Sequence, residues 1–243
     1  MGVVSFHTTA RKKESKFIVA NSRSYQKSIK VATDLFLAVV CLSLLSPILL
    51  VLAFLVWLNL GNPIFFRQIR PGYKGKPFVI YKFRTMKNTS DGMGKYLPDA
   101  ERLTRFGRWL RHSSLDELPE LINVLRAEMS LVGPRPLLME YLDRYTPEQF
   151  RRHDMRPGIT GLAQVMGRNA IPFSARIAYD TWYIDNFSLW LDFKILVMTV
   201  LKVTTGSLYD GAGQDVKLVD DLGLHRDHDL AANIPHRNTP SAT

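Results

Sequence analysis

An unbroken apolar segment is the strongest feature in the pattern of hydrophobic and polar positions along this chain. Residues 35–60 contain no charged side chain, and the run exceeds the ~20 residues that a helix needs to cross a bilayer. Ser46 and Pro47 lie near its middle, where a proline removes one helical hydrogen bond and kinks the axis. The Ser46 hydroxyl could satisfy a backbone group that the proline frees. No signal-peptide cleavage site follows, so we expect the segment to remain in the mature protein.

The rest of the pattern predicts short strands and several helices. Aromatic and β-branched residues around Pro-Gly and Lys-Gly turn signals predict a β-hairpin within residues 63–83. Helical spacing returns over residues 103–125, and residues 175–186 also have a helical pattern. Residues 187–203 predict an apolar helix that either lies in a membrane interface or packs in a core. The fold class that we expect is α+β and mainly helical.

Composition and charge narrow the class of protein. The chain has 243 residues, 46% of them hydrophobic, which excludes wholesale disorder. Its net charge of +10 is held in blocks, with seven basic and two acidic residues in 1–34 and seven basic and no acidic residues in 67–90. The segment 91–204 is nearly balanced, and 205–243 is acidic. A single cysteine, Cys41, excludes an internal disulfide and favours a reducing compartment.

The two basic blocks flank the apolar segment, which favours a membrane surface over a nucleic acid as the partner of this charge. Loops rich in Lys and Arg stay cytoplasmic, and here both flanks are rich. A re-entrant helix hairpin, broken at Ser46 and Pro47, would keep both flanks on one side, whereas a kinked single-pass helix remains the alternative. We therefore expect four parts: a basic lead (1–30), a re-entrant membrane helix (31–62), a cytoplasmic domain (63–204) and an acidic polar tail (205–243).

Two adjacent carboxylates, Asp116 and Glu117, are the strongest candidates for chemistry. Neighbouring side chains on a helix point about 100° apart, so at least one carboxylate should face a site if the flanking leucines pack. A carboxylate can bind Mg²⁺, act as a general base or attack phosphorus. The alternative, which the spacing alone favours, is a capping box with Ser114 as N-cap and Glu117 three residues later.

Four cationic residues are candidates to bind phosphate: Lys82, Arg84, Arg111 and Arg135. Arginine forks match phosphate oxygens. Arg135 stands between two prolines, which restrict its backbone and so favour a role that depends on direction. The sequence contains none of the common nucleotide-loop, hydrolase or zincin motifs.

Several motifs, taken in order over residues 30–203, resemble those of the monotopic phosphoglycosyl transferases, bacterial enzymes that begin glycoconjugate assembly. They are the apolar segment with Ser46-Pro47, GNPIFFRQIRPGYKGKPF, YKFRTM, RHSSLDELPEL, NVLRAEMSLVGPRP and RPGITGLAQVMGRN. The segment YDTWYIDNFSLWLDFKI is most similar to small, single-domain members of the bacillosamine-transferase type. Among mild departures, Glu120 stands where glutamine is common.

The resemblance implies transfer of a phosphosugar from a UDP-sugar to a polyprenyl phosphate, such as undecaprenyl phosphate, with release of UMP. The reaction would be ping-pong, with Asp116 as nucleophile and as ligand of a Mg²⁺ cofactor, and Glu117 beside it as ligand or base. Arg111 would meet a phosphate at the membrane face. Arg135, with Lys82 or Arg84, would meet the nucleotide phosphates.

The resemblance also implies a place in the cell. The chain would sit in one leaflet of the bacterial inner membrane, with interfacial amphipathic helices and its catalytic domain facing the cytoplasm. It would serve polysaccharide, lipopolysaccharide or glycoprotein assembly, would not need nucleic acid, and could form a homodimer. A non-enzymatic alternative is a single-pass membrane adaptor whose basic flanks bind lipid or nucleic acid. The sugar, the lipid and the oligomeric state stay open at this point.

Overall fold

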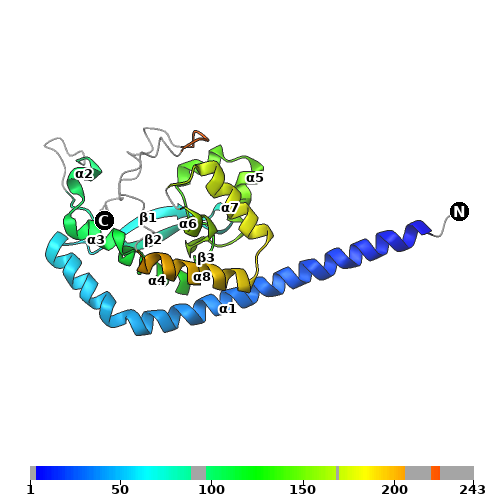
Figure 1. The fold of residues 1–243 in the computed structure, drawn as a ribbon, viewed down its shortest axis with the longest axis horizontal. Helices are drawn as coiled ribbons and strands as arrows, with labels where there is room; N and C mark the ends of the chain where they lie inside the picture. Colours follow the sequence, from blue (N-terminus) through cyan, green and yellow to red (C-terminus); the bar gives the residue numbers. More distant parts are fainter. Residues whose placement is uncertain (1–3, 89–96, 168–169, 206–219, 225–243) are drawn as a thin grey trace, which may run out of the picture.

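The longest element is helix α1 (Val4–Leu60), in a computed structural model that describes residues 4–88, 97–167, 170–205 and 220–224. The residues expected to form the lead and those expected to form the hairpin therefore lie in one helix. Figure 1 shows α1 passing along the folded domain and bending before it reaches strand β1. Pro47 lies inside the helix, and the Ser46 hydroxyl donates to the Ser43 carbonyl over 2.9 Å. That carbonyl is the one that the missing proline N–H would have bonded, so the predicted compensation by Ser46 is confirmed.

The apolar half of α1 is mostly uncovered by protein. Residues Ser28–Leu60 are long and apolar enough to cross a membrane, and only 11% of their most apolar window is buried. A core helix of a soluble protein would bury most of such a surface. Ala38, Leu52 and Val56 are the fully buried exceptions and mark the side that packs on the domain. The exposed remainder, in a helix of this hydropathy, indicates association with a membrane.

The predicted hairpin is confirmed. Strands β1 (Phe65–Pro71) and β2 (Pro77–Phe83) pair antiparallel across the 3-10 turn η1 (Tyr73–Gly75). Asn123 locks the free edge of β2, since its buried amide accepts from the Tyr81 N–H (3.1 Å) and donates to the Val79 carbonyl (2.7 Å). Edge backbone groups are thus satisfied by a side chain instead of a third strand.

The helix expected over residues 103–125 is divided in the structure. Helix α3 (Arg105–His112) ends before Ser114, whose φ of 56° is left-handed, and a 3-10 turn η2 (Leu115–Glu117) leads into helix α4 (Glu120–Leu125). A left-handed residue stops a right-handed helix, so the apolar spacing continues across the break although the helix does not.

The remaining elements complete a mainly helical α+β domain. Helix α7 (Phe173–Asp185) confirms the helix expected over residues 175–186. The short strands β3 (Ser130–Val132) and β4 (Gly158–Thr160) pair in parallel. The elements are α2 (Asp99–Arg102), β3 (Ser130–Val132), η3 (Met139–Arg144), α5 (Pro147–Phe150), η4 (Arg151–Asp154), β4 (Gly158–Thr160), α6 (Leu162–Met166), α7 (Phe173–Asp185) and α8 (Leu189–Thr204).

Helix α8 has features of both alternatives left open by its sequence. Asp192 and Ile195 are buried against the domain, whereas Trp190, Phe193 and Val200 are more than half exposed. Figure 1 shows α8 alongside α1, and Lys30 of α1 pairs with Asp192 of α8. One side of α8 is therefore core, and the other is an uncovered apolar surface.

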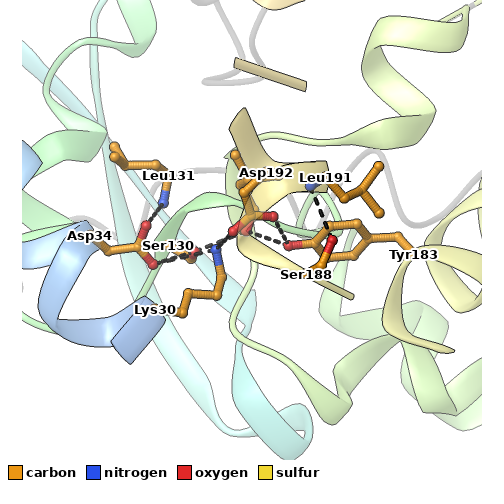
Figure 2. A network of polar contacts seen from close by, with 9 residues as sticks. Lys30, Asp34, Ser130, Leu131, Tyr183, Ser188, Leu191 and Asp192 are labelled. Atoms are coloured by element: carbon orange, nitrogen blue, oxygen red, sulfur yellow. Dashed lines mark hydrogen bonds and ion pairs between the residues drawn. The ribbon is translucent and has the colours of Figure 1, made fainter. Parts of the chain in front are cut away.

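Both ends of the apolar segment are tied to the same domain. At its start, Lys30 pairs with Asp192 (2.5 Å) and Asp34 (3.5 Å), and Figure 2 shows how these groups converge. The Ser130 hydroxyl donates to Asp34 over 2.6 Å, and the Tyr183 hydroxyl donates to Asp192 over 2.6 Å. A buried charge is stable only when it is paired and hydrogen-bonded, so this network fixes the first half of the segment to β3, α7 and α8.

A close backbone contact joins α3 to the end of the hairpin, and we expect Gly107→Ala to weaken it. A Cβ at Gly107 would lie 1.9 Å from the Thr85 carbonyl oxygen. The helix would have to move, at a cost of about 3 kcal/mol. Urea unfolding of the detergent-solubilised protein measures the change, with Arg108→Ala on the exposed side of α3 as the control. Equal stability of the two variants would contradict this packing.

Candidate active site

Two buried carboxylates from turn η2 form the centre of the candidate site. Asp116 and Glu117 are each 8% exposed. Their neighbours Leu115 and Leu118 pack against the cluster of Leu52, Val56, Phe83 and Leu110. Because the leucines hold this side of the turn in the core, both carboxylates are directed into the protein instead of bulk solvent.

The capping-box alternative is wrong. Ser114 stands at the N-cap of η2, but its side chain makes no cap hydrogen bond. Its hydroxyl is buried with no hydrogen-bond partner among the residues that the structure describes. A capping serine has extended backbone geometry, which the left-handed Ser114 does not have, and Glu117 is engaged elsewhere.

Glu117 is held by two cations from distant parts of the chain. Lys82 Nζ, from strand β2, lies 2.8 Å from Glu117 Oε1. Arg135, from the turn after β3, donates through Nη1 to Oε2 (3.2 Å) and through Nη2 to Oε1. This two-point contact is the geometry in which an arginine also binds phosphate. The structure therefore brings together three of the residues that the sequence singled out.

Asp116 is the uncommitted carboxylate of the pair. In the described part of the chain, no hydrogen bond or ion pair engages its oxygens. Burial raises the pKa of Asp116 to about 6, and the negative charge of Glu117 adds to this shift, while Lys82, Arg111 and Arg135 oppose it. A buried carboxylate with this pKa is ionised at neutral pH yet poorly solvated, which suits a nucleophile.

Arg111 and Arg84 have different roles. Arg111, in the last turn of α3, donates through Nε to the Thr85 hydroxyl over 3.0 Å and acts electrostatically on Asp116. Arg84 is buried and donates to the carbonyls of Leu60, Gly61 (2.6 Å) and Asn62 (3.0 Å). Those carbonyls close the end of α1, where helical acceptors need partners. In the structure Arg84 thus holds the end of α1, and the expectation that it binds substrate phosphate stays a prediction.

Glu120 is a third carboxylate, which the sequence reasoning did not include among the candidates. It is 1% exposed, and its Oε1 lies 3.0 Å from Lys82 Nζ. Burial and the neighbouring Glu117 raise its pKa to about 7, against the opposing charges of Lys82 and Arg135. Its position four residues after Asp116 on a helical pattern was a usable signal, since such residues share a face.

The side chains of the site can be compared with those that bind Mg²⁺ in other proteins. Among the described residues, no three His, Cys, Asp or Glu side chains are grouped to hold a metal ion. Mg²⁺ is commonly bound by one or two carboxylates together with substrate phosphates. Asp116 supplies one such carboxylate, so the site fits an ion that is shared with a diphosphate.

The raised pKa of Asp116 predicts the pH dependence of any reaction in which this carboxylate attacks. The attacking form is ionised, so the second-order rate constant of the first half-reaction should fall about tenfold for each pH unit below 6 and level off above 7. Single-turnover release of the leaving group measures it without a second substrate. Glu120→Gln is the control and should show the same fall in the rate constant below pH 6. Loss of this pH dependence in Glu120→Gln would assign it to Glu120 instead of Asp116.

The known proteins to which this chain is similar include sugar and sugar-phosphate transferases. The family model described as bacterial sugar transferase matches residues 25–206. The uncharacterized sugar transferase EpsL of Bacillus subtilis is 53% identical over 175 residues, which cover 72% of this chain and 87% of that protein. The UDP-glucose:undecaprenyl-phosphate glucose-1-phosphate transferase of Xanthomonas campestris pv. campestris is 43% identical, with 72% of this chain and 38% of that protein covered.

A third relative is named for another sugar. The UDP-N-acetylgalactosamine-undecaprenyl-phosphate N-acetylgalactosaminephosphotransferase of Aeromonas hydrophila is 40% identical, with 73% of this chain and 44% of that protein covered. The chain spans less than half the length of these last two relatives. Similarity of this degree to proteins named for two different sugars does not select a sugar for this one.

Proposed function

Because this chain belongs to the bacterial sugar transferase family, we propose that it transfers a sugar phosphate from a UDP-sugar to undecaprenyl phosphate and releases UMP. The names of its relatives support this reaction. The observation that carries the proposal is an uncommitted buried carboxylate, Asp116, beside the cations Lys82 and Arg135. Such a group opposite phosphate-binding cations is suited to attack phosphorus.

We propose a covalent, two-step reaction. An Asp116 carboxylate oxygen attacks the phosphorus that bears the sugar, forming an O–P bond. The bond from that phosphorus to the bridging oxygen breaks, and UMP leaves with the electron pair. A polyprenyl phosphate oxygen then attacks the same phosphorus and breaks the bond to Asp116, which regenerates the carboxylate. Each half is an in-line displacement in which the protein supplies position and charge.

The cations would exchange partners when the substrate enters. In the structure, Lys82 and Arg135 are bound to Glu117. A diphosphate offers them oxygens of higher charge density, which would release Glu117 to act as ligand or base. Arg111, on the side of α3, would meet a phosphate at the membrane face. Mg²⁺ held by Asp116 and the diphosphate would neutralise phosphate charge.

The adaptor alternative is less compatible with the interior. Burial of three carboxylates within one site costs folding free energy. Asp116, Glu117 and Glu120 are all at most 8% exposed. A lipid-binding adaptor has no use for this destabilisation, whereas an enzyme does, because destabilised charge is the source of reactivity.

We propose that the apolar segment is a re-entrant hairpin. Lys30 and Asp34, at its start, bind residues of the domain, and Arg84 of the same domain binds the carbonyls at its end. A straight spanning helix would put these two ends on opposite faces of a ~30 Å hydrocarbon core. Contact of both ends with one domain therefore supports a helix that enters and leaves one leaflet.

We also propose that α8 lies in the membrane interface, on the cytoplasmic side. Its exposed Trp190 and Phe193 stack at 5.3 Å, and Lys194 lies 5.3 Å from the Trp190 ring. Aromatic residues with a neighbouring lysine are typical of headgroup depth. UDP-sugars are cytoplasmic substrates, so this face would be that of the inner membrane.

Cysteine labelling in oriented vesicles tests the topology. In a Cys41→Ser background, single cysteines at Ser28 and Tyr73 should react with an impermeant maleimide from the same side, because both flanks are expected to be cytoplasmic. Phe54→Cys, within the segment, is the control that should stay protected. Labelling of positions 28 and 73 from opposite sides would establish a single-pass helix.

A panel of UDP-sugars tests the reaction itself. The full chain in nanodiscs, supplied with undecaprenyl phosphate and Mg²⁺, should release UMP with at least one member of the panel. UMP release without sugar-phosphate transfer to the lipid would indicate a nucleotide-sugar hydrolase instead. No release with any UDP-sugar, from folded protein, would contradict the proposed function.

A further inference from the structure

Arg70, in strand β1, lies on the same face of the hairpin as Lys82. Successive residues of a strand point to opposite faces, and directly paired residues share a face. Lys82 pairs with Phe66, and Arg70 pairs with Phe78, so Phe66, Gln68 and Arg70 share the face of Lys82. Ile80 and Phe78, on that face of β2, are buried. Arg70 is therefore half-buried on the side that carries the acidic site.

In the part of the chain that the structure describes, the side chain to which Arg70 donates is a neutral amide. Its Nη2 donates to Gln68 Oε1 over 2.5 Å, and no ion pair in the described part of the chain joins it to a carboxylate. Burial lowers the pKa of Arg70 to about 10, and Arg135 is the strongest charge acting on it, while Glu140, Tyr141 and Glu120 oppose these effects more weakly. Two neighbouring guanidinium groups repel unless an anion lies between them.

Arg135 links this charge to the catalytic groups. Its guanidinium contacts Glu117, and its backbone carbonyl accepts from Arg152 Nη2 over 2.8 Å. Arg152 is itself fixed by a buried ion pair with Asp180 at 2.6 Å. Arg135 is thus held at Glu117 through its side chain and at Arg152 through its backbone, and it lines one small hollow together with Pro71, the residue after Arg70. An anion bound by Arg70 and Arg135 together would lie next to the group that Asp116 attacks.

Lys82 and Arg70 lie at opposite ends of the hairpin, and this separation bears on where the lipid phosphate and the nucleotide phosphate would bind. Lys82 lies at the end of β2 that adjoins Arg84 and the exit of α1 at Leu60. Arg70 lies four residues along β1 from the partner of Lys82, or about 13 Å at ~3.3 Å per residue. In the proposed reaction the lipid phosphate would reach the site from the membrane helix, which leaves the far end of the hairpin for the nucleotide.

We propose that Arg70, with Arg135, forms the subsite for the nucleotide phosphate, the one that leaves as UMP. This inference rests on the proposed function for the identity of the anion and on the hairpin register for its place. Arg70 acts as a binding residue that holds the leaving phosphate while Asp116 attacks its neighbour. The same contact would retain UMP after the first half-reaction.

Direct binding of UMP tests the subsite without relying on turnover. Isothermal titration of the full chain in nanodiscs should give an affinity for UMP that falls tenfold or more in Arg70→Gln, a variant that keeps much of the side-chain length. The matched control is Arg67→Ala, on the same strand but the opposite face, where Arg67 lies over the Tyr81 ring at 5.6 Å. It should bind UMP within twofold of the wild type. Thermal unfolding of both variants identifies any loss of fold, and Arg70→Lys repeats the test if Arg70→Gln does not fold.

The outcomes distinguish the subsite from the proposed function. Equal UMP affinity in the folded Arg70 variants and the wild type, or no UMP binding by the wild type, overturns the subsite. A raised KM for undecaprenyl phosphate with unchanged UMP binding also overturns it, by assigning Arg70 to the lipid. If UMP binding depends on Arg70 but no UDP-sugar is turned over, the subsite stands and the transferase proposal fails.

Discussion

Replacement of Asp116 by Asn should abolish sugar-phosphate transfer and at the same time stabilise the fold. Asparagine cannot form the aspartyl phosphate, so the rate should fall by at least ~10⁴-fold, as expected for loss of a nucleophile. The stability gain follows from the pKa. Because burial raises the pKa of Asp116 to about 6 from 3.8, its ionised form destabilises the folded state, by ~1.4 kcal/mol for each pH unit that separates the two values.

The size of this stability gain depends on pH. Well below pH 3.8 Asp116 is protonated in both the folded and the unfolded chain, so the variant and the wild type should be equally stable there. The difference should grow between pH 4 and 6 and reach about 2 to 3 kcal/mol above pH 6. Urea unfolding at pH 4 and pH 8 measures it. Asp185→Asn, on the exposed end of α7, is the control, and full activity in Asp116→Asn would contradict the covalent mechanism.

Replacement of Arg135 by Lys should cost about 10²-fold in the rate of UMP release, and replacement by Ala about 10³-fold. Arg135 makes a two-point contact with Glu117, which a lysine ammonium cannot reproduce. Loss of one preorganised donor at a developing charge costs ~10²–10³-fold in comparable sites. Single-turnover kinetics with a saturating UDP-sugar measures the chemical step apart from binding.

A surface arginine provides the matched control. Arg126, at the end of α4, pairs with Glu128 at 3.3 Å and is more than half exposed in its side chain. Exposed pairs of this kind contribute little, so Arg126→Lys should release UMP within twofold of the wild type. A rate for Arg135→Lys within threefold of the wild type would show that the fork of Arg135 is not used in the reaction.

The sequence predicted the elements whose signals are local. The hairpin of residues 63–83 and helix α7 follow from turn residues and apolar spacing, and the Ser46 contact follows from the chemistry of Pro47. The break at Ser114 was missed because a serine in left-handed geometry leaves no mark in the pattern, whereas a glycine would have done.

The sequence singled out only some residues of the candidate site, because contacts between distant residues leave no local signal. Asp116, Lys82 and Arg135 were singled out by residue type together with the resemblance of the motifs that contain them, whereas the spacing around Asp116 alone favoured a capping box. Arg84 lies only two residues from Lys82, yet it binds the carbonyls of Leu60, Gly61 and Asn62, whereas Lys82 binds Glu117. Which cation faces the site depends on contacts between residues 18 to 35 positions apart, and these are outside the reach of local patterns.

The central claim is that Asp116 carries the sugar phosphate, and intact-protein mass spectrometry tests it most directly. Purified full chain is incubated with a UDP-sugar and Mg²⁺ in the absence of lipid acceptor. The wild type should gain the mass of one sugar phosphate, lose it when undecaprenyl phosphate is added, and show no gain in Asp116→Asn. Release of UMP without any adduct, or an adduct of the same mass on Asp116→Asn, would contradict the account.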